Sequence, residues 1–522
     1  MRKAADVFNY IIALCLFIAG VVVIVVSSTT TIYYDMGYDV DWPQYGKENI
    51  PLLLVFVACV IIVFAFLYNR KIFDKSNLFL VIAILFISIY CLTLILTIRP
   101  QAVNDSKTLD DIINQFMKGD YSALTQSGGY LFIWPFQLGY VGFGQIMYRV
   151  FGESNYFAWD IVQLLCILLT IYLIYRLTWE FFEDKQICGI AMLLSCGALF
   201  FYNYVTYIYG DIISMAPQTL ALYMMVLYVK RRKIRYALIS GASIAIAILL
   251  KTNCEIALIA LMIVLVGNSL ISQSDKESVK DSSKMKARVV ESVVLAGLML
   301  ALVFGAKAAV NAYYCNLTGL DRIPEGSPAW SHIAMGLQES ELEDGWYNGY
   351  NYHVLAENDY DSAAAAVAAK QNIGQTLKTF IDRPLHGARF FMRKFTTQWA
   401  DSVCISTHNL DLVSRHVENQ PPLCDFLVFG KGSQILIWVM NVFMPVCYIG
   451  VIIYLLCILK GRKPTAYEML LLILIFGGIV FHEFWEGSSR YTMRYYIYYL
   501  PFGAYGLKVL LGFICEHIKR KI

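Results

Sequence analysis

Long runs of apolar residues constrain this chain more than any other feature of its sequence. Runs of about 18 to 25 residues recur along it, and an α-helix of that length crosses a hydrocarbon core of about 30 Å. The composition agrees, because 58% of the 522 residues are hydrophobic and only 16% are charged, whereas soluble domains carry about a quarter charged residues. We therefore predict an all-α polytopic membrane protein with about twelve transmembrane helices. The predicted spans are 7–28, 51–68, 78–98, 157–177, 187–208, 212–229, 235–250, 253–271, 289–312, 434–458, 465–484 and 494–514.

The distribution of lysine and arginine predicts which side of the membrane each loop faces. Short cytoplasmic loops are enriched in these residues, and the basic segments fall at 69–75, 230–235, 460–463 and the C-terminal end. The polar segment 273–288 is predicted to be a flexible cytoplasmic loop. Both termini are then cytoplasmic, and the net charge of +3 gives no indication of nucleic-acid binding because the cations lie in these loops.

One further apolar stretch, residues 130–151, is long enough to span but breaks this pattern. If it crossed the membrane, every later basic loop would face outward. It also contains Pro135 and Gly139, which are unfavourable inside a regular helix. We therefore predict a helix on the outer membrane surface, with residues 99–156 forming one extracytoplasmic loop. The alternative is that 130–151 spans and another candidate, such as 212–229, does not.

Three other segments are predicted to lie outside the membrane on the extracytoplasmic side. The loop at 35–50 is acidic and aromatic. Residues 106–121 place apolar side chains such as Leu109 and Ile113 at helical spacing, as in an amphipathic helix at the membrane interface. Residues 313–433 lack a spanning run and contain helix-forming and turn sequences, so they are predicted to form a small, mostly helical domain.

These predictions divide the chain into four parts. We expect an N-terminal transmembrane hairpin at 1–77, a transmembrane core at 78–312, an extracytoplasmic domain at 313–433 and C-terminal transmembrane helices at 434–522. The thirteen cysteines include no CxxC pair and no zinc spacing. A disulfide among Cys315, Cys404 and Cys424 is left open.

Ionisable residues at the ends of spans are costly and are therefore candidates for function. Asp105 follows the third span and precedes the amphipathic segment, where a helix N-terminus favours an ionised carboxylate that can act as a base or bind a metal. The alternative is that it only caps that helix. Asp211 lies at an outer turn between two spans, where an ordinary loop aspartate is the alternative.

Two further candidates are basic. Lys251 separates two apolar runs with almost no loop between them and can bind a lipid phosphate, or it is a lysine that only extends to the interface. The segment 482–496, HEFWEGSSRYTMRYY, contains Glu486, Arg490 and Arg494. Because the two arginines are four residues apart, they share a helix face suited to phosphate binding. The alternative is an aromatic and basic membrane anchor.

Several motifs are missing from the sequence. It contains no HExxH, GxGxxG, Walker A or GxSxG motif, which argues against a nucleotide-driven motor and a serine hydrolase. No metal-ligand spacing is present, and whether a divalent metal takes part is left open.

An ordered set of motifs resembles the GT-C class of integral-membrane glycosyltransferases, and within it the family-39-like enzymes of bacterial envelopes. The motifs are NDSKTLDDIINQFMKGDYSAL (104–124), GGYLFIWPFQLGYVGFGQIMYRVFG (128–152), IYGDIIS (208–214), LLKTN (249–253), RFFMRKFTTQW (389–399) and EGSSRYTMRYYIYYLP (486–501). The resemblance covers most of the chain from about residue 78 onward. The chain departs from simpler members by two additional spans before the third. It also has Ser106 where protein mannosyltransferases carry a second acid, which speaks against a protein acceptor.

The resemblance implies a GT-C-like core that transfers one sugar from a polyprenyl-phosphate donor in the bilayer to an acceptor on the extracytoplasmic face. The acceptor would be an envelope polysaccharide or, less in keeping with Ser106, a protein, and no nucleotide sugar would be needed. Asp105 would deprotonate the acceptor hydroxyl. Asp211 would orient the acceptor or help to bind a metal.

The resemblance also implies a set of substrate-binding residues. Cations at headgroup level would stabilise the charge on the departing lipid phosphate. That set is Lys251, Arg393, Glu486, Arg490 and Arg494.

Two other functions remain open from the sequence. A lipid-linked oligosaccharide flippase or another transporter would also have about twelve spans, although such proteins place polar residues and broken helices near the middle of the membrane. An O-antigen ligase or polymerase would share the lipid carrier and the outer site, and His482 keeps that alternative open.

Overall fold

The computed structural model describes all residues except 1, 36, 38, 272–281, 416–419 and 522. The elements before residue 260 are α1 (Arg2–Thr29), β1 (Thr30–Tyr34), β2 (Pro43–Lys47), α2 (Ile50–Asn69), η1 (Ile72–Asp74), α3 (Ser76–Ile98), α4 (Asn104–Met117), α5 (Ser122–Thr125), α6 (Tyr130–Ile133), η2 (Pro135–Gln137), α7 (Leu138–Phe151), α8 (Tyr156–Phe182), α9 (Lys185–Ser195), α10 (Leu199–Asn203), η3 (Tyr204–Thr206), α11 (Gly210–Ile213), α12 (Met215–Arg231), α13 (Ile234–Leu250), η4 (Thr252–Cys254) and α14 (Glu255–Ile271). The later elements are α15 (Ser282–Thr318), α16 (Ala329–Gly336), α17 (Tyr350–Ala356), α18 (Ser362–Asp382), α19 (Pro384–Trp399), α20 (Ser406–Ser414), α21 (Pro422–Cys424), η7 (Asp425–Phe429), α22 (Lys431–Leu459), α23 (Ala466–Phe484) and α24 (Ser489–Lys521).

Many of these helices are long and apolar, which confirms the predicted all-α, multi-pass membrane class. Within the described residues, nine helices are long and apolar enough to cross a membrane, or up to ten if a bent pair counts as one span. The bent pair is Lys185–Ser195 with Leu199–Thr206, which meet at 56°. Two shorter apolar helices, Ile234–Leu250 and Thr252–Asn268, occupy two further predicted spans. The count of twelve stays a prediction.

The predicted surface helix at 130–151 is three short pieces. α6 ends at Ile133, η2 carries Pro135, and α7 begins at Leu138. Proline lacks a backbone N–H and cannot continue the hydrogen-bond ladder of α6, so the helix breaks there. The stretch therefore does not form one continuous spanning helix.

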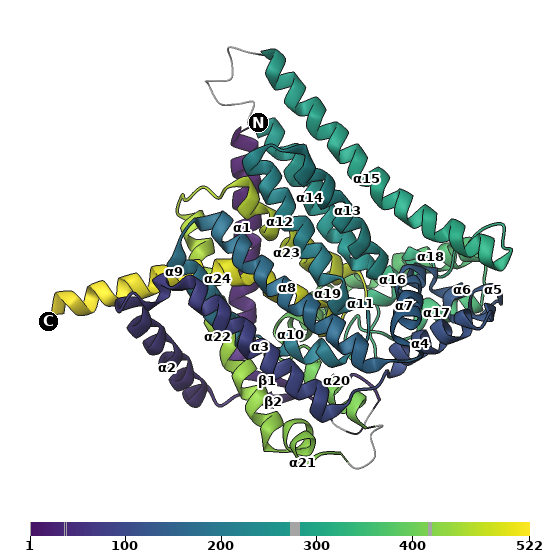
Figure 1. The fold of residues 1–522 in the computed structure, drawn as a ribbon, viewed down its shortest axis with the longest axis horizontal. Coiled ribbons are helices and arrows are strands. Elements are labelled where there is room, and N and C mark those ends of the chain that lie inside the picture. The colour runs from purple at the N-terminus through teal and green to yellow at the C-terminus, as the bar shows by residue number, and fades with distance from the viewer. Residues whose placement is uncertain (1, 36, 38, 272–281, 416–419, 522) are drawn as a thin grey trace.

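The two segments predicted to be extracytoplasmic, 99–156 and 313–433, pack against each other. Ile133 of α6 forms a small apolar cluster with Val354, Leu355 and Ala365 of the later segment. The backbone N–H of Ser327 also donates to the carbonyl of Ile133 at 2.9 Å. Helices α4–α7 and α16–α18 accordingly lie together at one end of the molecule, at the right in Figure 1. Residues 313–433 are mostly helical, and their assignment as an extracytoplasmic domain stays a prediction.

The amphipathic helix predicted at 106–121 is α4. Its apolar face, including Leu109 and Ile113, is buried. Ile113 packs against Gly144 of α7, where an added Cβ would lie only 2.1 Å from the isoleucine side chain. The face predicted to contact lipid is thus largely covered by α7, because the glycine lets the two helices approach closely.

The loop predicted at 35–50 contains one strand, β2, of a small antiparallel sheet whose other strand, β1, precedes the loop. Strands β1 and β2 pair with Thr30 opposite Lys47 and Tyr34 opposite Pro43. The β-branched and aromatic residues of TTIYY favour strand structure, which an acidic-loop interpretation overlooks. The hairpin connects α1 to α2, the two helices of the predicted N-terminal part.

The segment predicted as a cytoplasmic loop at 273–288 is described only in part. Residues 272–281 lie outside the described residues, and helix α15 begins at Ser282. α15 lies along one edge of the molecule against α13 and α14 (Figure 1). All thirteen cysteines, including Cys315, Cys404 and Cys424, are free thiols.

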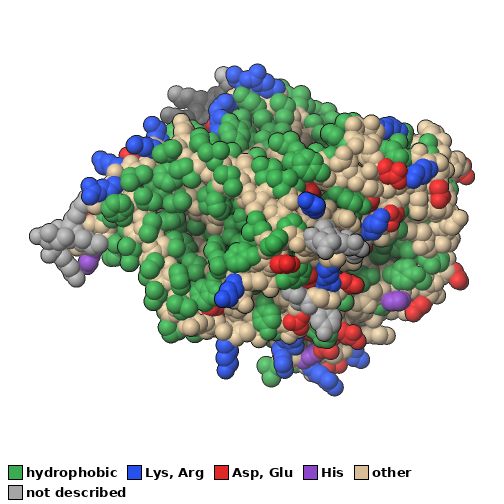
Figure 2. All heavy atoms as spheres, turned by 60° about the horizontal axis from the view of Figure 1, so that its bottom comes forward, with side chains coloured by type: hydrophobic (Ala, Val, Ile, Leu, Met, Phe, Trp, Pro, Cys, Tyr) green, Lys and Arg blue, Asp and Glu red, His purple; other side chains and the backbone are tan. Residues whose placement is uncertain are grey.

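The outer surface carries the pattern expected of a membrane protein. Figure 2 shows hydrophobic side chains spread over a broad part of one face, with most Asp and Glu side chains toward its right and lower edge. Many large apolar side chains on the long helices are exposed, including Val55 on α2 and Ile89 on α3. In a bilayer such side chains contact lipid rather than water.

Candidate functional site

Asp211 and Lys251 form a buried ion pair where two helices nearly touch. Lys251 Nζ lies 3.1 Å from Asp211 Oδ1 and donates a hydrogen bond to Oδ2 at 3.3 Å. The side chain of Asp211 is only 2% exposed and that of Lys251 is 11% exposed. A Cβ at Gly210 would lie 2.3 Å from the carbonyl oxygen of Leu250, so the glycine lets the start of α11 reach the end of α13. This packing brings the carboxylate to the ammonium group, and neither residue is a solvated loop or interface side chain.

The first turns of α24 add two arginines to this pair. Arg494 Nη2 lies 4.0 Å from Asp211 Oδ1 and donates to Ser214 Oγ at 3.2 Å. Its Nη1 donates to Gln218 Oε1 at 3.3 Å. Arg490, one turn earlier, donates to Tyr207 OH at 3.1 Å. The i, i+4 spacing thus places both guanidinium groups on one face, as the sequence predicts.

The site carries more positive than negative charge close to Asp211. Burial lowers the pKa of Lys251 below its usual range, the carboxylate of Asp211 opposes this, and the charges of Arg490 and Arg494 lower the pKa further. One carboxylate therefore lies among three cations. An anionic group entering the site would gain from this excess, because charges interact strongly where water is excluded.

Glu486 lies beside this group, in the turn before α24. Its Oε1 accepts a hydrogen bond from Tyr491 OH at 2.9 Å. Burial raises the pKa of Glu486, the hydrogen bond and the charges of Arg490 and Lys251 lower it, and the charge of Asp105 raises it. The predicted residues Glu486, Arg490, Arg494, Asp211 and Lys251 therefore come together, although they lie far apart in the sequence.

The turn that carries Glu486 is held by the segment 313–433. The ammonium group of Lys394 on α19 is buried and donates to the carbonyl oxygens of Glu483 at 3.1 Å and Trp485 at 2.7 Å. It also donates to the carbonyl of Gly336. Burial lowers the pKa of Lys394 to about 8, while the charges of nearby glutamates raise it.

A second anchor holds the start of α24. Asp401 accepts hydrogen bonds from Ser489 Oγ at 2.6 Å and Tyr34 OH at 2.8 Å. Burial raises the pKa of Asp401, and these hydrogen bonds lower it. Because Tyr34 belongs to β1, the β1–β2 hairpin helps to position the helix that carries Arg490.

Asp105 lies at the rim of the same site and is exposed. Its carboxylate raises the pKa values of Tyr130, Tyr207 and Tyr209, in addition to the larger effect of burial. Asp105 does not cap α4, because Ser106 Oγ accepts from the backbone N–H of Val103 at 2.9 Å and completes the cap. The carboxylate is therefore available at the open side of the tyrosine cluster.

Arg393 lies in a different cluster. Its Nη2 donates to both carboxylate oxygens of Glu343, at 3.0 and 2.9 Å. Tyr45 OH donates to the same carboxylate at 2.6 Å. The structure therefore does not bring Arg393 together with Lys251 and Arg490.

His482 is buried at the end of α23, with its ring stacked on Tyr491 at a centroid distance of 5.4 Å. Within the described part of the chain, neither ring nitrogen has a hydrogen-bond partner. The histidine thus borders the site through Tyr491.

Tyrosines form part of the site that the sequence does not single out. The Lys251 ammonium lies 4.3 Å from the ring centre of Tyr209, and Arg490 lies over the rings of Tyr207, Tyr209 and Tyr491. Such cation–π contacts hold cations in a partly dehydrated site. The signal was the aromatic run before Asp211, which is also typical of an interfacial belt.

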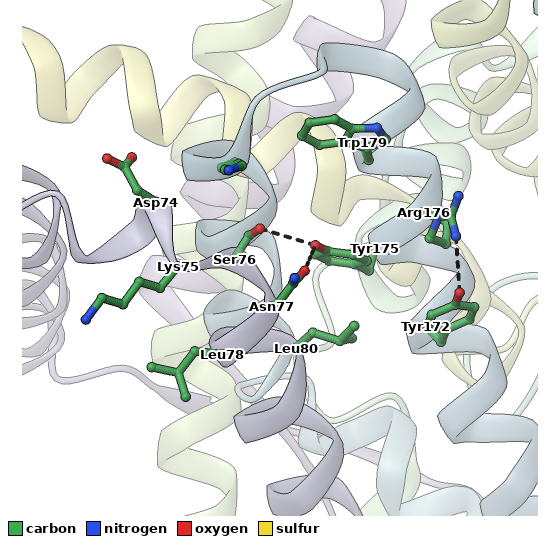
Figure 3. A pocket seen from close by; sticks show the side chains of 11 residues that line it. Asp74, Lys75, Ser76, Asn77, Leu78, Leu80, Tyr172, Tyr175, Arg176 and Trp179 are labelled. Carbon is green, nitrogen blue, oxygen red and sulfur yellow. Dashed lines mark hydrogen bonds between the residues drawn. The ribbon is translucent and has the colours of Figure 1, made fainter.

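Other features of the described residues lie apart from this site. No group of three or more His, Cys, Asp or Glu side chains in the described chain is placed to hold a metal ion. A cavity of about 510 Å³ lies at the start of α3 and the end of α8, lined by residues such as Asn77, Tyr175 and Trp179 (Figure 3). Tyr175 OH donates there to Asn77 Oδ1 at 2.7 Å. This cavity contains none of the predicted site residues.

Comparisons with known proteins give limited matches. No curated protein sequence matches the chain. Two solved structures of ArnT from Cupriavidus metallidurans, one bound to undecaprenyl phosphate and one in the apo state, match at 14% and 12% identity with TM-scores of 0.35 and 0.28. Each match covers 82% of this chain, and 77% and 76% of the ArnT chain. At TM-scores this low, the likeness supports no conclusion about activity.

A family model gives the more informative match. Residues 142–308 match the model of the dolichyl-phosphate-mannose-protein mannosyltransferase family. This range includes Asp211 and Lys251 and ends before the arginines of α24. Over these residues the chain is similar to that family, which confirms the resemblance to GT-C membrane glycosyltransferases that its motifs indicate.

Proposed function

We propose that this chain is a membrane glycosyltransferase that moves a sugar from a polyprenyl-phosphate donor to an envelope glycan or similar acceptor on the extracytoplasmic face. The observation that carries the proposal is the convergence of Lys251, Arg490 and Arg494 around Asp211, with Asp105 exposed at the rim. Cations inside the site and a carboxylate at its rim suit a reaction in which a phosphate leaves and a hydroxyl loses its proton.

The proposed reaction assigns one role to each side of the site. The acceptor hydroxyl oxygen attacks the anomeric carbon of the sugar, and the bond from that carbon to the phosphate oxygen breaks. Asp105 takes the hydroxyl proton as general base. The leaving phosphate keeps the bonding electron pair, and Lys251 and Arg490 stabilise its charge. Asp211 positions Lys251, and Arg494 positions Asp211.

The remaining assignments are part of the same proposal. Glu486 orients Tyr491 and Arg490 through its hydrogen bond. Arg393 is paired with Glu343, apart from Lys251 and Arg490. We therefore place it on the acceptor side and not at the phosphate. We also propose that both termini are cytoplasmic and that the site faces outward. The chain is divided into parts at 1–77, 78–312, 313–433 and 434–522, and the extracytoplasmic loop 99–156 belongs to the second part.

Replacing Asp105 tests the proposal. Asp105→Asn keeps the shape of the side chain but removes the base, so we expect sugar transfer to fall about 10²- to 10⁴-fold while donor binding is kept. Asp111→Asn, an exposed position on the same helix, is the matched control and should retain full transfer. Wild-type activity in Asp105→Asn would remove the base assignment.

A second candidate, an enzyme like an O-antigen ligase or polymerase, is favoured by the unpartnered ring of His482 beside Tyr491. His482→Gln should abolish transfer if the histidine acts in the chemistry. In the glycosyltransferase proposed above, this variant keeps most of its activity because the ring only packs against Tyr491.

A further inference from the structure

A second cavity, of about 580 Å³, lies between the β1–β2 hairpin and the segment 313–433. The hairpin contributes residues 42–45, and the other walls are the loop 339–344 and one face of α19. The lining includes the aromatic rings of Trp42 and Tyr45, the carboxylates of Glu341 and Glu343, and the guanidinium groups of Arg389 and Arg393.

The three walls are joined by a buried carboxylate. Glu343 accepts hydrogen bonds from Tyr45 OH at 2.6 Å and from Arg393 at 3.0 Å. The hairpin, the loop and α19 therefore meet at one side chain. This arrangement fixes the cavity shape before any ligand binds.

The groups that remain free suit a polyhydroxylated ligand. Trp42 is 52% exposed and Tyr45 is 47% exposed, so their ring faces are available to the apolar face of a sugar. Within the described chain, Glu341 and Arg389 have no side-chain partner. Hydroxyl groups can donate to the carboxylate and accept from the guanidinium group.

The charge of the lining narrows the class of ligand. The cavity is lined by four carboxylates, including Glu341 and Glu343, but by only the two guanidinium groups of Arg389 and Arg393. This excess of negative charge disfavours a phosphate or a uronic acid and accepts a neutral or amino sugar. The polar lining equally disfavours a lipid tail.

The cavity is linked to the candidate active site by the backbone. The loop that carries Glu341 and Glu343 continues to Gly345, whose carbonyl accepts from the N–H of Gly487 at 2.8 Å. Gly487 directly follows Glu486. A ligand in the cavity therefore lies next to the segment that carries Glu486.

We infer that this cavity is a second saccharide subsite, which holds a neutral or amino-bearing unit of the acceptor glycan while another unit reacts. The inference rests on the proposed function, because it takes the acceptor to be an envelope glycan. The subsite sets which glycan is accepted, and its residues do not contact the departing phosphate.

Binding, rather than turnover, tests the subsite. Full-length protein in nanodiscs is mixed with fluorescently labelled oligosaccharides released from the envelope of the cells that make the protein, separated by anion exchange into neutral, amino-sugar and acidic fractions. We expect the neutral or the amino-sugar fraction to bind and the acidic fraction to bind at least tenfold more weakly. Trp42→Ala should weaken binding about tenfold, because one aromatic contact is lost.

Matched controls separate the outcomes. Trp330→Ala removes another exposed tryptophan, on α16, and should leave binding unchanged. Asp105→Asn should bind the saccharide like the wild type although it does not transfer sugar. Equal binding of all fractions, no binding of the neutral and amino fractions, or wild-type binding by Trp42→Ala overturns the subsite. If the wild type transfers sugar while any of these results is found, the proposed function stands and only the subsite falls.

Discussion

At the residue scale, the two arginines of α24 have different surroundings. Arg494 is buried, and its guanidinium group is used by Gln218, Ser214 and Cys254. Arg490 keeps its Nε without a hydrogen-bond partner among the described residues. We therefore propose that the departing phosphate binds Arg490, while Arg494 holds Asp211 in place.

The effect of replacing Arg490 follows from this difference. Arg490→Gln removes a charged donor, and hydrogen bonds to charged groups contribute about 1.5–3 kcal/mol, so donor affinity should fall about 10- to 100-fold. Equilibrium binding of the polyprenyl-phosphate donor measures this effect. Arg176→Gln, at the cavity of Figure 3, is the control and should bind the donor normally. Unchanged affinity in Arg490→Gln would place the phosphate elsewhere.

The sequence predicts which residues matter here better than it predicts their partners. The motif around Asp211 and the one around Lys251 are local, and the i, i+4 spacing of Arg490 and Arg494 depends only on helix geometry. The hydrogen bond between Arg490 and Tyr207 joins positions 283 residues apart, and no local pattern encodes it. The pairing of Arg393 with Glu343 is likewise revealed only by the fold.

At the element scale, glycines decide how closely the C-terminal helices pack. A Cβ at Gly506 of α24 would lie 1.8 Å from the carbonyl oxygen of Gly450 on α22. Gly506→Ala should therefore force the helices apart and cost about 1–3 kcal/mol of stability, seen as a lower thermal unfolding midpoint in detergent. At Gly512 of the same helix the nearest atom would lie at 3.5 Å, so Gly512→Ala should not lower the midpoint. Equal midpoints for both variants would contradict this packing.

The docking of α16 should depend on pH. The ring of His332 stacks on Trp485 at 4.9 Å, and burial lowers its pKa to about 4. An unfolded histidine titrates near 6.5, so between these values the unfolded chain binds a proton that the folded chain does not. Stability should therefore be lost as pH falls from about 6.5 to about 4, by up to about 3 kcal/mol.

Thermal unfolding at pH 7 and pH 5 measures this loss. His332→Phe keeps a stacked ring but cannot be protonated, so its midpoint should fall less than that of the wild type. His353→Phe, an exposed position, should behave like the wild type. An identical fall in all three proteins would show that His332 does not titrate in this range.

Element boundaries are predicted well where apolar periodicity is long, as in α8 and α22. They are predicted poorly where short polar segments take their structure from neighbours. The strand TTIYY pairs with Pro43–Lys47, and α4 buries its apolar face on α7 instead of in lipid. In both cases the deciding contact comes from another segment of the chain.

At the scale of the whole molecule, the segment 313–433 and the β1–β2 hairpin both help to position the candidate site. Lys394 and Gly345 hold the turn of Glu486, and Tyr34 holds the start of α24 through Asp401. The β1–β2 hairpin thus contributes to the site.

The most direct test of this account follows both products of a single reaction. Wild-type protein in vesicles is given a polyprenyl-phosphate donor labelled in its sugar, together with envelope glycan. We expect one polyprenyl monophosphate to be released for each labelled sugar that appears on the glycan. Labelled lipid that crosses the bilayer intact, or a glycan that stays unlabelled while donor is bound, would contradict it.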